Sequence, residues 1–227
     1  MVSIKFNIYY FFSFVKVKIK KLLFNIFKKN SIPNSPQFSK KDFYFFKRLI
    51  KNKTNIIEYG MGGSTIFLVK KNKHVISVET DENFLQIIKK KLPDINTDKN
   101  TLFYENIGET NLWGFPIDNR INKTNILRWK KYIRSPWKYV NNKNFPDLVL
   151  IDGRFRVACA AYALKKLKNK NKGLIFFDDF NSRDYYNEIL AVGSKVKKLD
   201  RACIFAPKRV SNKIYDSLIN KFSKDSR

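Results

Sequence analysis

Cysteine, histidine and acidic residues are scarce in this chain of 227 residues, and each shortage excludes a class of protein. Cys159 and Cys203 lie far apart without metal-ligand spacing, which excludes a small secreted domain held together by disulfides. Cys159 stands in a run of small residues typical of a helix, so we expect a buried thiol there. His74 is the only histidine, which excludes metal sites built from several histidines and favours a structural role for this residue.

Long apolar runs are also absent. No stretch approaches the ~20 apolar residues that a membrane-spanning helix needs. Residues 1–29 combine basic and aromatic side chains without a small-residue cleavage site, so a signal peptide is not expected. Two interpretations of this segment stay open: it lies at an anionic membrane surface, or it is a helix or loose extension beside the domain. We predict an extension and linker over 1–38, a folded domain over 39–227, and a cytoplasmic protein that can contact the inner membrane face.

The charge of the chain is strongly unbalanced, with 46 Lys and Arg against 19 Asp and Glu and a net charge of +27. Such a surplus suggests a nucleic-acid partner, because basic side chains neutralise phosphates. However, lysine far outnumbers arginine, and Asn, Ile and Phe are abundant too, as expected if an AT-rich genome biased the codons. Arginine is the better bidentate reader of phosphate and guanine. A nucleic-acid partner is therefore possible but not favoured.

Strand and helix patterns alternate from residue 39 onward. We expect strands at 55–59, 74–79, 101–104, 147–151 and 173–177, followed by a hairpin at 192–199 and 202–206. We expect helices from 39, then at 64–71, 81–91, 156–167, 184–190 and 211–222. Ser39 is the expected cap of the first helix, and Asp42 completes an acidic capping box. The alternation predicts an α/β, doubly wound, mostly parallel seven-stranded sheet with a terminal antiparallel hairpin.

A glycine-rich turn over residues 57–65, Ile-Glu-Tyr-Gly-Met-Gly-Gly-Ser-Thr, separates the first strand from the next helix. Glycines there let the backbone approach a ligand closely, and a helix N-terminus offers free N–H groups. Glu58, two residues before Gly60, would repel a pyrophosphate and attract a cationic ligand. Thr65 stands where a dinucleotide fingerprint requires glycine or alanine, which disfavours an NAD-dependent oxidoreductase. Glu79 ends the second strand, where it can accept hydrogen bonds from ribose hydroxyls.

These residues resemble the signature of the class I S-adenosylmethionine-dependent methyltransferases. The resemblance covers about residues 54–206, and the segments Glu58–Thr65, Trp113–Pro116 and Ile151–Arg156 are similar to a little-characterised bacterial branch. It implies S-adenosylmethionine as cofactor, with its methionine end at the glycine turn, its ribose at Glu79 and its adenine near Asn106. The cofactor-binding residues implied in this way are Glu58, Gly60, Gly62, Gly63, Ser64, Thr65, Glu79, Asn106 and Ile107.

Three aspartates follow the later strands: Asp152 after the fourth, and Asp178 and Asp179 after the fifth. Ligands of open parallel sheets bind beyond the carboxyl ends of the strands, so we expect these side chains to converge near the glycine turn. Asp152 is the candidate catalytic base for an acceptor proton. Alternatively, the three carboxylates hold Mg²⁺, as the partial resemblance to metal-dependent O-methyltransferases suggests, although Mg²⁺ is not the favoured cofactor. A third interpretation makes them helix caps or ion-pair partners of Arg154, Arg156 and Arg183.

Residues 108–145 are expected to be irregular and are the best candidates for acceptor recognition, because loops of this length are usually functional or disordered. Their tryptophans, Trp113, Trp129 and Trp137, either stack on an acceptor or form a satellite core. Arg154 and Arg156 alternate, so we expect one to clamp an anionic acceptor group and the other to stay on the surface. The predicted substrate contacts are Trp113, Arg154, Asp178 and Asp179.

The resulting hypothesis is a methyltransferase that acts on a small-molecule or glycan-like acceptor. The alternative is a non-catalytic protein that uses a methyltransferase-like scaffold to bind nucleic acid or a membrane surface. The basic N-terminal segment favours this alternative, whereas the glycine turn with Glu58 and Glu79 favours the enzyme. The sequence gives no indication of the oligomeric state.

Overall fold

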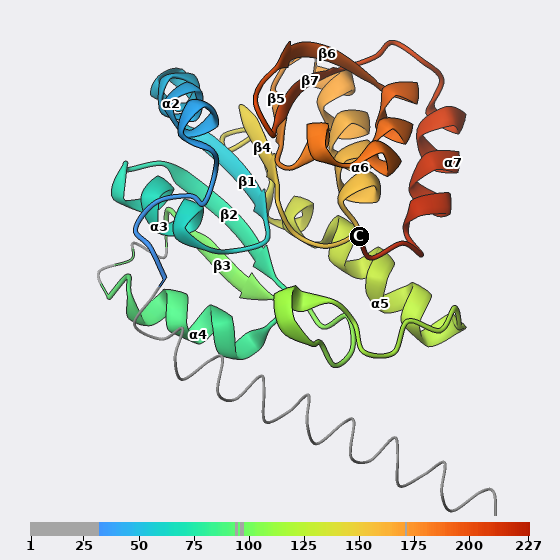
Figure 1. Cartoon of the computed structure of the whole chain (residues 1–227), viewed down its shortest axis with the longest axis horizontal. Coiled ribbons are helices and arrows are strands. Elements are labelled where there is room, and N and C mark those ends of the chain that lie inside the picture. The colour runs from blue at the N-terminus through green and yellow to red at the C-terminus, as the bar shows by residue number, and fades with distance from the viewer. Residues whose placement is uncertain (1–31, 94, 96–97, 171) are drawn as a thin grey trace, which may run out of the picture.

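A mixed seven-stranded sheet with helices on both faces forms the domain (Figure 1). The computed structural model describes residues 32–93, 95, 98–170 and 172–227, so the basic segment 1–29 lies outside the described residues. Within those ranges, no helix is both long enough and apolar enough to cross a bilayer.

The strands follow the order β3-β2-β1-β4-β5-β7-β6. Parallel pairing joins β1 (Asn55–Tyr59), β2 (His74–Glu79), β3 (Thr101–Tyr104), β4 (Leu148–Ile151) and β5 (Leu174–Phe177). The hairpin of β6 (Gly193–Lys198) and β7 (Cys203–Pro207) adds an antiparallel edge next to β5. The predicted doubly wound sheet with a terminal hairpin is confirmed. The strand order reverses between β1 and β4, which marks the crevice where such sheets bind ligands.

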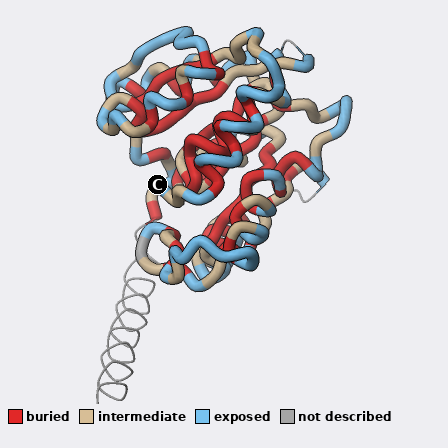
Figure 2. Tube along the Cα trace, turned by 90° about the vertical axis from the view of Figure 1, so that its right-hand side faces the viewer, coloured by how far each residue is buried: buried red, intermediate tan, exposed pale blue. Residues whose placement is uncertain are grey.

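Alternate residues of the strands other than β6 supply two separate cores, one on each face of the sheet. In β1, Ile56 packs with α2 (Lys40–Leu49), α3 (Gly63–Lys70) and α4 (Glu82–Lys90). Ile57 and Tyr59 pack on the opposite side with α5 (Lys123–Arg134), α6 (Arg156–Lys170) and α7 (Asn212–Phe222). Figure 2 shows the buried residues concentrated along the strands and the inner helix faces. Burial of both faces explains the nearly continuous apolar character of the strands.

Residues 108–145 are more regular than predicted. They contain helix α5 and the 3₁₀ turns η2 (Leu112–Gly114) and η3 (Ser135–Tyr139). Asn122 caps α5 by accepting a hydrogen bond from the backbone of Asn125. Trp129 and Trp137 are buried against the sheet, as the satellite-core interpretation expects, whereas Trp113 is 64% exposed. The expectation of an irregular stretch was therefore wrong.

Residues 32–38, expected to act as a linker, pack onto the domain. Ile32 is buried, and the Phe38 ring stacks on Phe176 with centroids 4.9 Å apart. A Cβ placed on Gly63 would lie 2.1 Å from the carbonyl oxygen of Ser35, so this segment rests directly on the glycine turn.

The capping box predicted at the start of α2 is only half present. The Ser39 hydroxyl accepts the Asp42 N–H at 3.2 Å, as expected. The wholly buried Asp42 carboxylate instead accepts the N–H groups of Asp200, Arg201 and Ala202 at 2.8–3.0 Å. Asp42 therefore ties α2 to the turn of the β6–β7 hairpin, because this distant turn supplies three free N–H donors.

Candidate functional site

A cavity of about 510 Å³ lies at the carboxyl ends of β1, β2, β4 and β5, where the strand order reverses. Its walls come from the glycine turn, the ends of β2, β4 and β5, the segment before α2, and the turn around η2. The residues that line the cavity include Gln37, Gly60, Gly62, Gly63, Ser64, Glu79, Asp81, Phe84, Trp113, Phe115, Tyr132, Asp152, Arg154, Arg156, Asp178, Asp179, Arg183 and Arg201.

The glycines of the turn are required for different reasons. Gly60 has φ +89°, and a Cβ there would lie 2.7 Å from the Cα of Gly153, so the close packing of two strand ends requires glycine. A side chain on Gly63 would collide with Ser35. Gly62 has an extended φ of 176°, and a Cβ on it would meet no protein atom within 4 Å. Because Gly62 lines the cavity, this open space is available to a ligand.

Glu58 lies beneath the glycine turn and does not line the cavity. Its wholly buried carboxylate accepts hydrogen bonds from the hydroxyls of Ser64, Thr65 and Ser77, each at 2.6 Å. Burial raises the pKa of Glu58 to about 7, although these three hydroxyls oppose the shift. Thr65 Oγ1 also accepts the Gly62 N–H at 3.0 Å. The structure therefore places Glu58 and Thr65 as supports of the turn, while Ser64 reaches the cavity wall.

Glu79 lies at the cavity wall and fixes the end of β2 to the glycine turn. Its Oε2 accepts the Met61 N–H at 2.9 Å, and Oε1 accepts the N–H groups of Thr80 and Asp81 at 2.6 and 3.0 Å. Burial raises the pKa of this carboxyl group. Since Oε2 accepts one N–H and a carboxylate oxygen can accept two hydrogen bonds, Oε2 can still accept a ligand hydroxyl.

Asn106 and Ile107, implied to lie near the adenine, are not among the residues that line the cavity. Asn106 is exposed, and its side chain accepts the Gly108 N–H at 2.8 Å. Ile107 is buried in the core, where its carbonyl accepts the Trp129 indole N–H at 3.2 Å. The structure does not bring these two residues to the cavity that holds Glu79 and the glycine turn.

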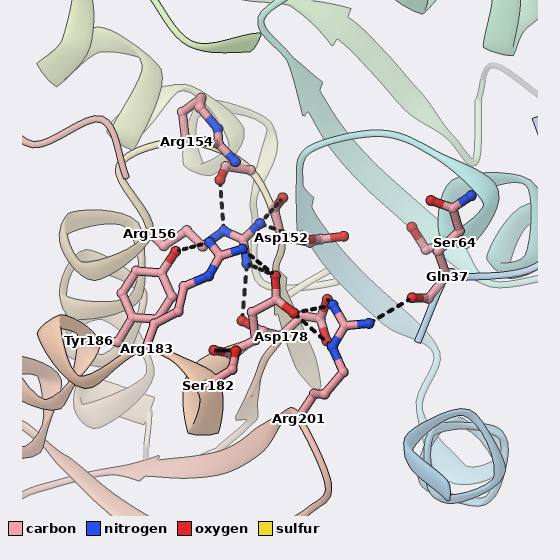
Figure 3. A network of polar contacts seen from close by, with 12 residues as sticks. Gln37, Ser64, Asp152, Arg154, Arg156, Asp178, Ser182, Arg183, Tyr186 and Arg201 are labelled. Carbon is pink, nitrogen blue, oxygen red and sulfur yellow. Dashed lines mark hydrogen bonds and ion pairs between the residues drawn. The ribbon is translucent and has the colours of Figure 1, made fainter. Parts of the chain in front are cut away.

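Arg156 joins the ends of β4 and β5 (Figure 3). Its guanidinium donates to Asp152 Oδ1 at 2.8 Å, to Asp179 Oδ2 at 3.4 Å and to the Asp178 carbonyl at 3.1 Å. Arg156 is buried, so the prediction that Arg154 or Arg156 would stay on the surface was wrong; Arg154 is buried too. The carboxylates at these strand ends require the buried charge of Arg156 as a counter-ion.

Asp179 is held by ion pairs, as one interpretation of the aspartates proposed. Arg183 donates to its Oδ2 at 3.0 Å, and Arg201 donates to its Oδ1 through Nε at 2.9 Å and through Nη2 (Figure 3). These guanidinium groups, together with Arg156, hold the pKa of Asp179 below its usual range despite its burial. Asp179 therefore organises the arginines around it.

Of the three aspartates, Asp152 and Asp178 keep capacity for a ligand. The Asp152 side chain is 35% exposed at the cavity, and burial among other carboxylates raises its pKa. Asp178 is 3% exposed, and its Oδ1 has no hydrogen-bond partner. Burial raises the pKa of Asp178 to about 8, and Asp152 and Asp179 add to the shift. Two carboxyl groups with raised pKa values in one cavity are typical of a functional site.

Arg154 is a buried cation without an ion-pair partner among the described residues. It is 7% exposed, and its Nη1 makes no hydrogen bond. The guanidinium lies 3.9 Å from the centroid of the Phe115 ring. Trp113, in the same turn as Phe115, has φ +66° and stands exposed at the cavity wall. The structure thus brings all four predicted substrate contacts, Trp113, Arg154, Asp178 and Asp179, to one cavity.

The part of the chain that the structure describes contains no group of three or more His, Cys, Asp or Glu side chains arranged to hold a metal ion.

Comparison with known proteins identifies the fold. The sequence matches no protein-family model and no curated protein sequence. A solved structure does match: the methyltransferase-like protein from Silicibacter pomeroyi gives a TM-score of 0.67 at 23% identity, covering 86% of this chain and 99% of that chain. The chain has the class I methyltransferase fold. A Staphylococcus aureus protein provisionally described as a caffeoyl-CoA O-methyltransferase gives a lower TM-score of 0.46 at 18% identity, covering 89% of this chain and 99% of that chain.

Several residues of this methyltransferase-fold cavity were not predicted from the sequence. Arg201 reaches it from the β6–β7 turn and donates to the Gln37 carbonyl at 3.5 Å, while Tyr132 reaches it from α5. Their distance from the glycine turn along the sequence hides this proximity. One signal in the sequence points to Arg201: arginine is uncommon in this lysine-rich chain, so its few positions are candidates for specific ion pairs.

Proposed function

We propose that this protein is an S-adenosylmethionine-dependent methyltransferase that acts on a small-molecule or glycan-like acceptor. The observation that carries the proposal is the open space over Gly62, next to the Glu79 carboxylate, in a cavity at the strand-order reversal. Neither the backbone angle nor a neighbouring protein atom requires a glycine at position 62. A ligand that lies close to the backbone would explain why position 62 is a glycine.

The residues present fit this cofactor. Glu79 Oε2 would accept a ribose hydroxyl, and the glycine turn would receive the methionine end, supported from below by Glu58. Asp81 and Phe84 follow Glu79 in the chain and line the same cavity, so they are the residues best placed for the adenine. When bound, the cofactor supplies a methyl group on a positively charged sulfur. Asn106 and Ile107, predicted near the adenine, do not line the cavity and are not part of this cofactor site.

Asp152 is the proposed base for the acceptor proton. Arg156 holds its Oδ1 at 2.8 Å, which fixes the orientation of the carboxylate and leaves Oδ2 to take a proton. The side chain is exposed enough to reach an acceptor, and burial raises its pKa, which makes the carboxylate a stronger base. Positioning by the cavity walls would supply most of the remaining rate enhancement, because methyl transfer is an in-line displacement.

Calorimetric titration with S-adenosylhomocysteine tests the proposal. Wild-type protein is expected to bind, and Gly62→Ala to fold normally but bind at least about tenfold more weakly, because its methyl group would enter the ligand space without touching protein. Gln86→Ala, at an exposed position of α4, is the matched control and should bind like wild type. Absence of binding by folded wild-type protein would refute the proposal. Equal binding by Gly62→Ala would remove the observation on which it rests.

A further inference from the structure

Two buried side-chain polar atoms in the described ranges lack a hydrogen-bond partner, Arg154 Nη1 and Asp178 Oδ1. Both residues line the cavity. Buried polar groups are nearly always satisfied, and a buried charge without a counter-ion is costly. Groups that the protein itself leaves unsatisfied at a cavity wall are therefore groups that a ligand satisfies.

Among the residues that the structure describes, the basic residues of the cavity wall are all arginines: Arg154, Arg156, Arg183 and Arg201. No described lysine lines the cavity, although lysine is far commoner than arginine in the chain. The planar guanidinium binds carboxylates and phosphates through two parallel hydrogen bonds, which a lysine cannot do. Three of the four arginines already pair with carboxylates of the protein, and Arg154 alone does not.

Arg154 packs its side chain against the turn around η2. Its N–H donates to the Tyr132 hydroxyl at 3.3 Å, and its guanidinium lies over Phe115. Its Cγ would be 3.9 Å from a Cβ placed on Gly114, next to Phe115. Within the glycine turn, Gly63 faces the backbone of residues 33–35, and Gly60 packs on Gly153, the neighbour of Arg154. The guanidinium itself contacts the turn around η2, where the exposed Trp113 stands, and this contact favours the acceptor as its ligand.

We infer that the methyl acceptor carries an anionic group, a carboxylate or a phosphate, that pairs with Arg154. The inference rests on the proposed function and specifies its substrate class: a small anionic molecule that bears a separate hydroxyl or amine for methylation. The Phe115 ring would cover one face of the guanidinium and leave its N–H edge for the anion. Asp152 and Asp178 line the same cavity as Arg154, where they would receive the nucleophilic end of the acceptor.

Inorganic phosphate and acetate serve as probes for the anion site. Protein saturated with S-adenosylhomocysteine is melted at increasing concentrations of each anion, with chloride keeping the ionic strength constant. A ligand that binds only the folded state raises the melting temperature by mass action, which gives an apparent Kd. Arg154→Gln keeps a polar N–H donor but shortens the side chain and removes the charge, so it should weaken the binding of at least one probe about tenfold or more. Arg154→Lys should recover part of the loss.

Arg128→Gln is the matched control, since Arg128 is an exposed arginine on α5, and it should bind the probes like wild type. General stabilisation by excluded phosphate acts equally on all variants and cancels in the comparison. Equal stabilisation of wild type and Arg154→Gln by both anions would overturn the inference. Such a result would leave the proposed function intact, provided that both proteins bind S-adenosylhomocysteine.

A second titration tests whether Arg154 binds the anionic group of the acceptor or the carboxylate of the cofactor. Arg154→Gln should bind S-adenosylhomocysteine and 5′-methylthioadenosine, which lacks the amino-acid end, as tightly as wild type does. A loss of affinity for the first compound but not for the second would mean that Arg154 binds the carboxylate of the cofactor, and the assignment to the acceptor would be wrong. Failure of wild-type protein to bind either compound would count against the proposed function itself.

Discussion

The carboxylates around the cavity have different environments, and these environments separate their roles. Glu58 receives three hydroxyl donors and supports the turn, and Asp179 is neutralised by arginines. Glu79 and Asp152 each keep an oxygen for a ligand. Asp178 is the extreme case, because it is buried with one oxygen unsatisfied. Acidic side chains of one site thus support the turn, pair with arginines and, in our proposal, contact the ligand.

The raised pKa of Asp178 predicts a specific dependence of stability on pH. Burial next to Asp152 and Asp179 raises it to about 8, against the attraction of Arg156 and Arg201. The folded protein therefore keeps this proton up to about pH 8, whereas the unfolded chain loses it near pH 4. The stabilisation from this group is complete below about pH 4 and is lost as the pH rises through about 8.

Asp178→Asn cannot ionise, so it should escape this loss. Urea denaturation of both proteins between pH 5 and 9 should show wild type losing stability relative to Asp178→Asn by about 1.4 kcal/mol per pH unit within the window. Glu58, with its pKa near 7, titrates in both proteins and cancels in the difference. A difference in unfolding free energy that stays constant from pH 5 to 9 would contradict the buried, protonated state of Asp178.

Helices and strands with a clear apolar stripe were predicted well, and the one missed helix shows why. β2 and β3 have the predicted bounds, and α6 begins at the predicted Arg156. In α5, basic residues surround the buried side chains Trp129, Tyr132 and Ile133, so its pattern resembles that of a polar loop. Its helical structure depends on packing against the sheet, which local sequence does not reveal.

The contact between α2 and the β6–β7 turn makes a prediction about stability. Asp42→Ala would leave the N–H groups of Asp200, Arg201 and Ala202 without their acceptor, and should cost about 2–4 kcal/mol of unfolding free energy. The same turn carries Arg201 to the cavity, so this variant should also bind S-adenosylhomocysteine more weakly.

Asp216→Ala is the control for this measurement. Asp216 is half-exposed and pairs with Lys165 on the surface, so its loss should change the unfolding free energy by less than about 1 kcal/mol. If urea denaturation gave the same small change for both variants, the buried carboxylate of Asp42 would not be what holds the hairpin to α2.

At the scale of the whole molecule, the sheet topology and the position of the cavity were predictable from the sequence. The full set of residues that line the cavity was not. Glycine turns and acidic strand ends lie at fixed places relative to the strands, so Gly60, Glu79 and Asp152 could be placed in advance. Arg201 and the segment 32–37 reach the cavity through contacts between distant parts of the chain. Asn106 and Ile107 were implied by family resemblance alone, and their observed contacts are local ones after β3 and with α5, outside the cavity lining.

The net charge of +27 is likewise informative only in its distribution. Lysines are spread over the chain, but none of those in the described ranges lines the cavity, whose wall carries both arginines and aspartates. The wall is therefore a patterned electrostatic surface within a generally basic molecule. Such a surface favours a ligand that carries both signs of charge over a uniformly charged polymer.

A crystal structure of the protein grown with S-adenosylhomocysteine is the most direct test of the central claim, that this cavity is a cofactor site. The expected result is density along the cavity, with a ribose hydroxyl at hydrogen-bond distance from Glu79 Oε2 and the amino-acid end over Gly62. An empty cavity at saturating ligand, or ligand bound at another surface of the folded protein, would contradict the claim.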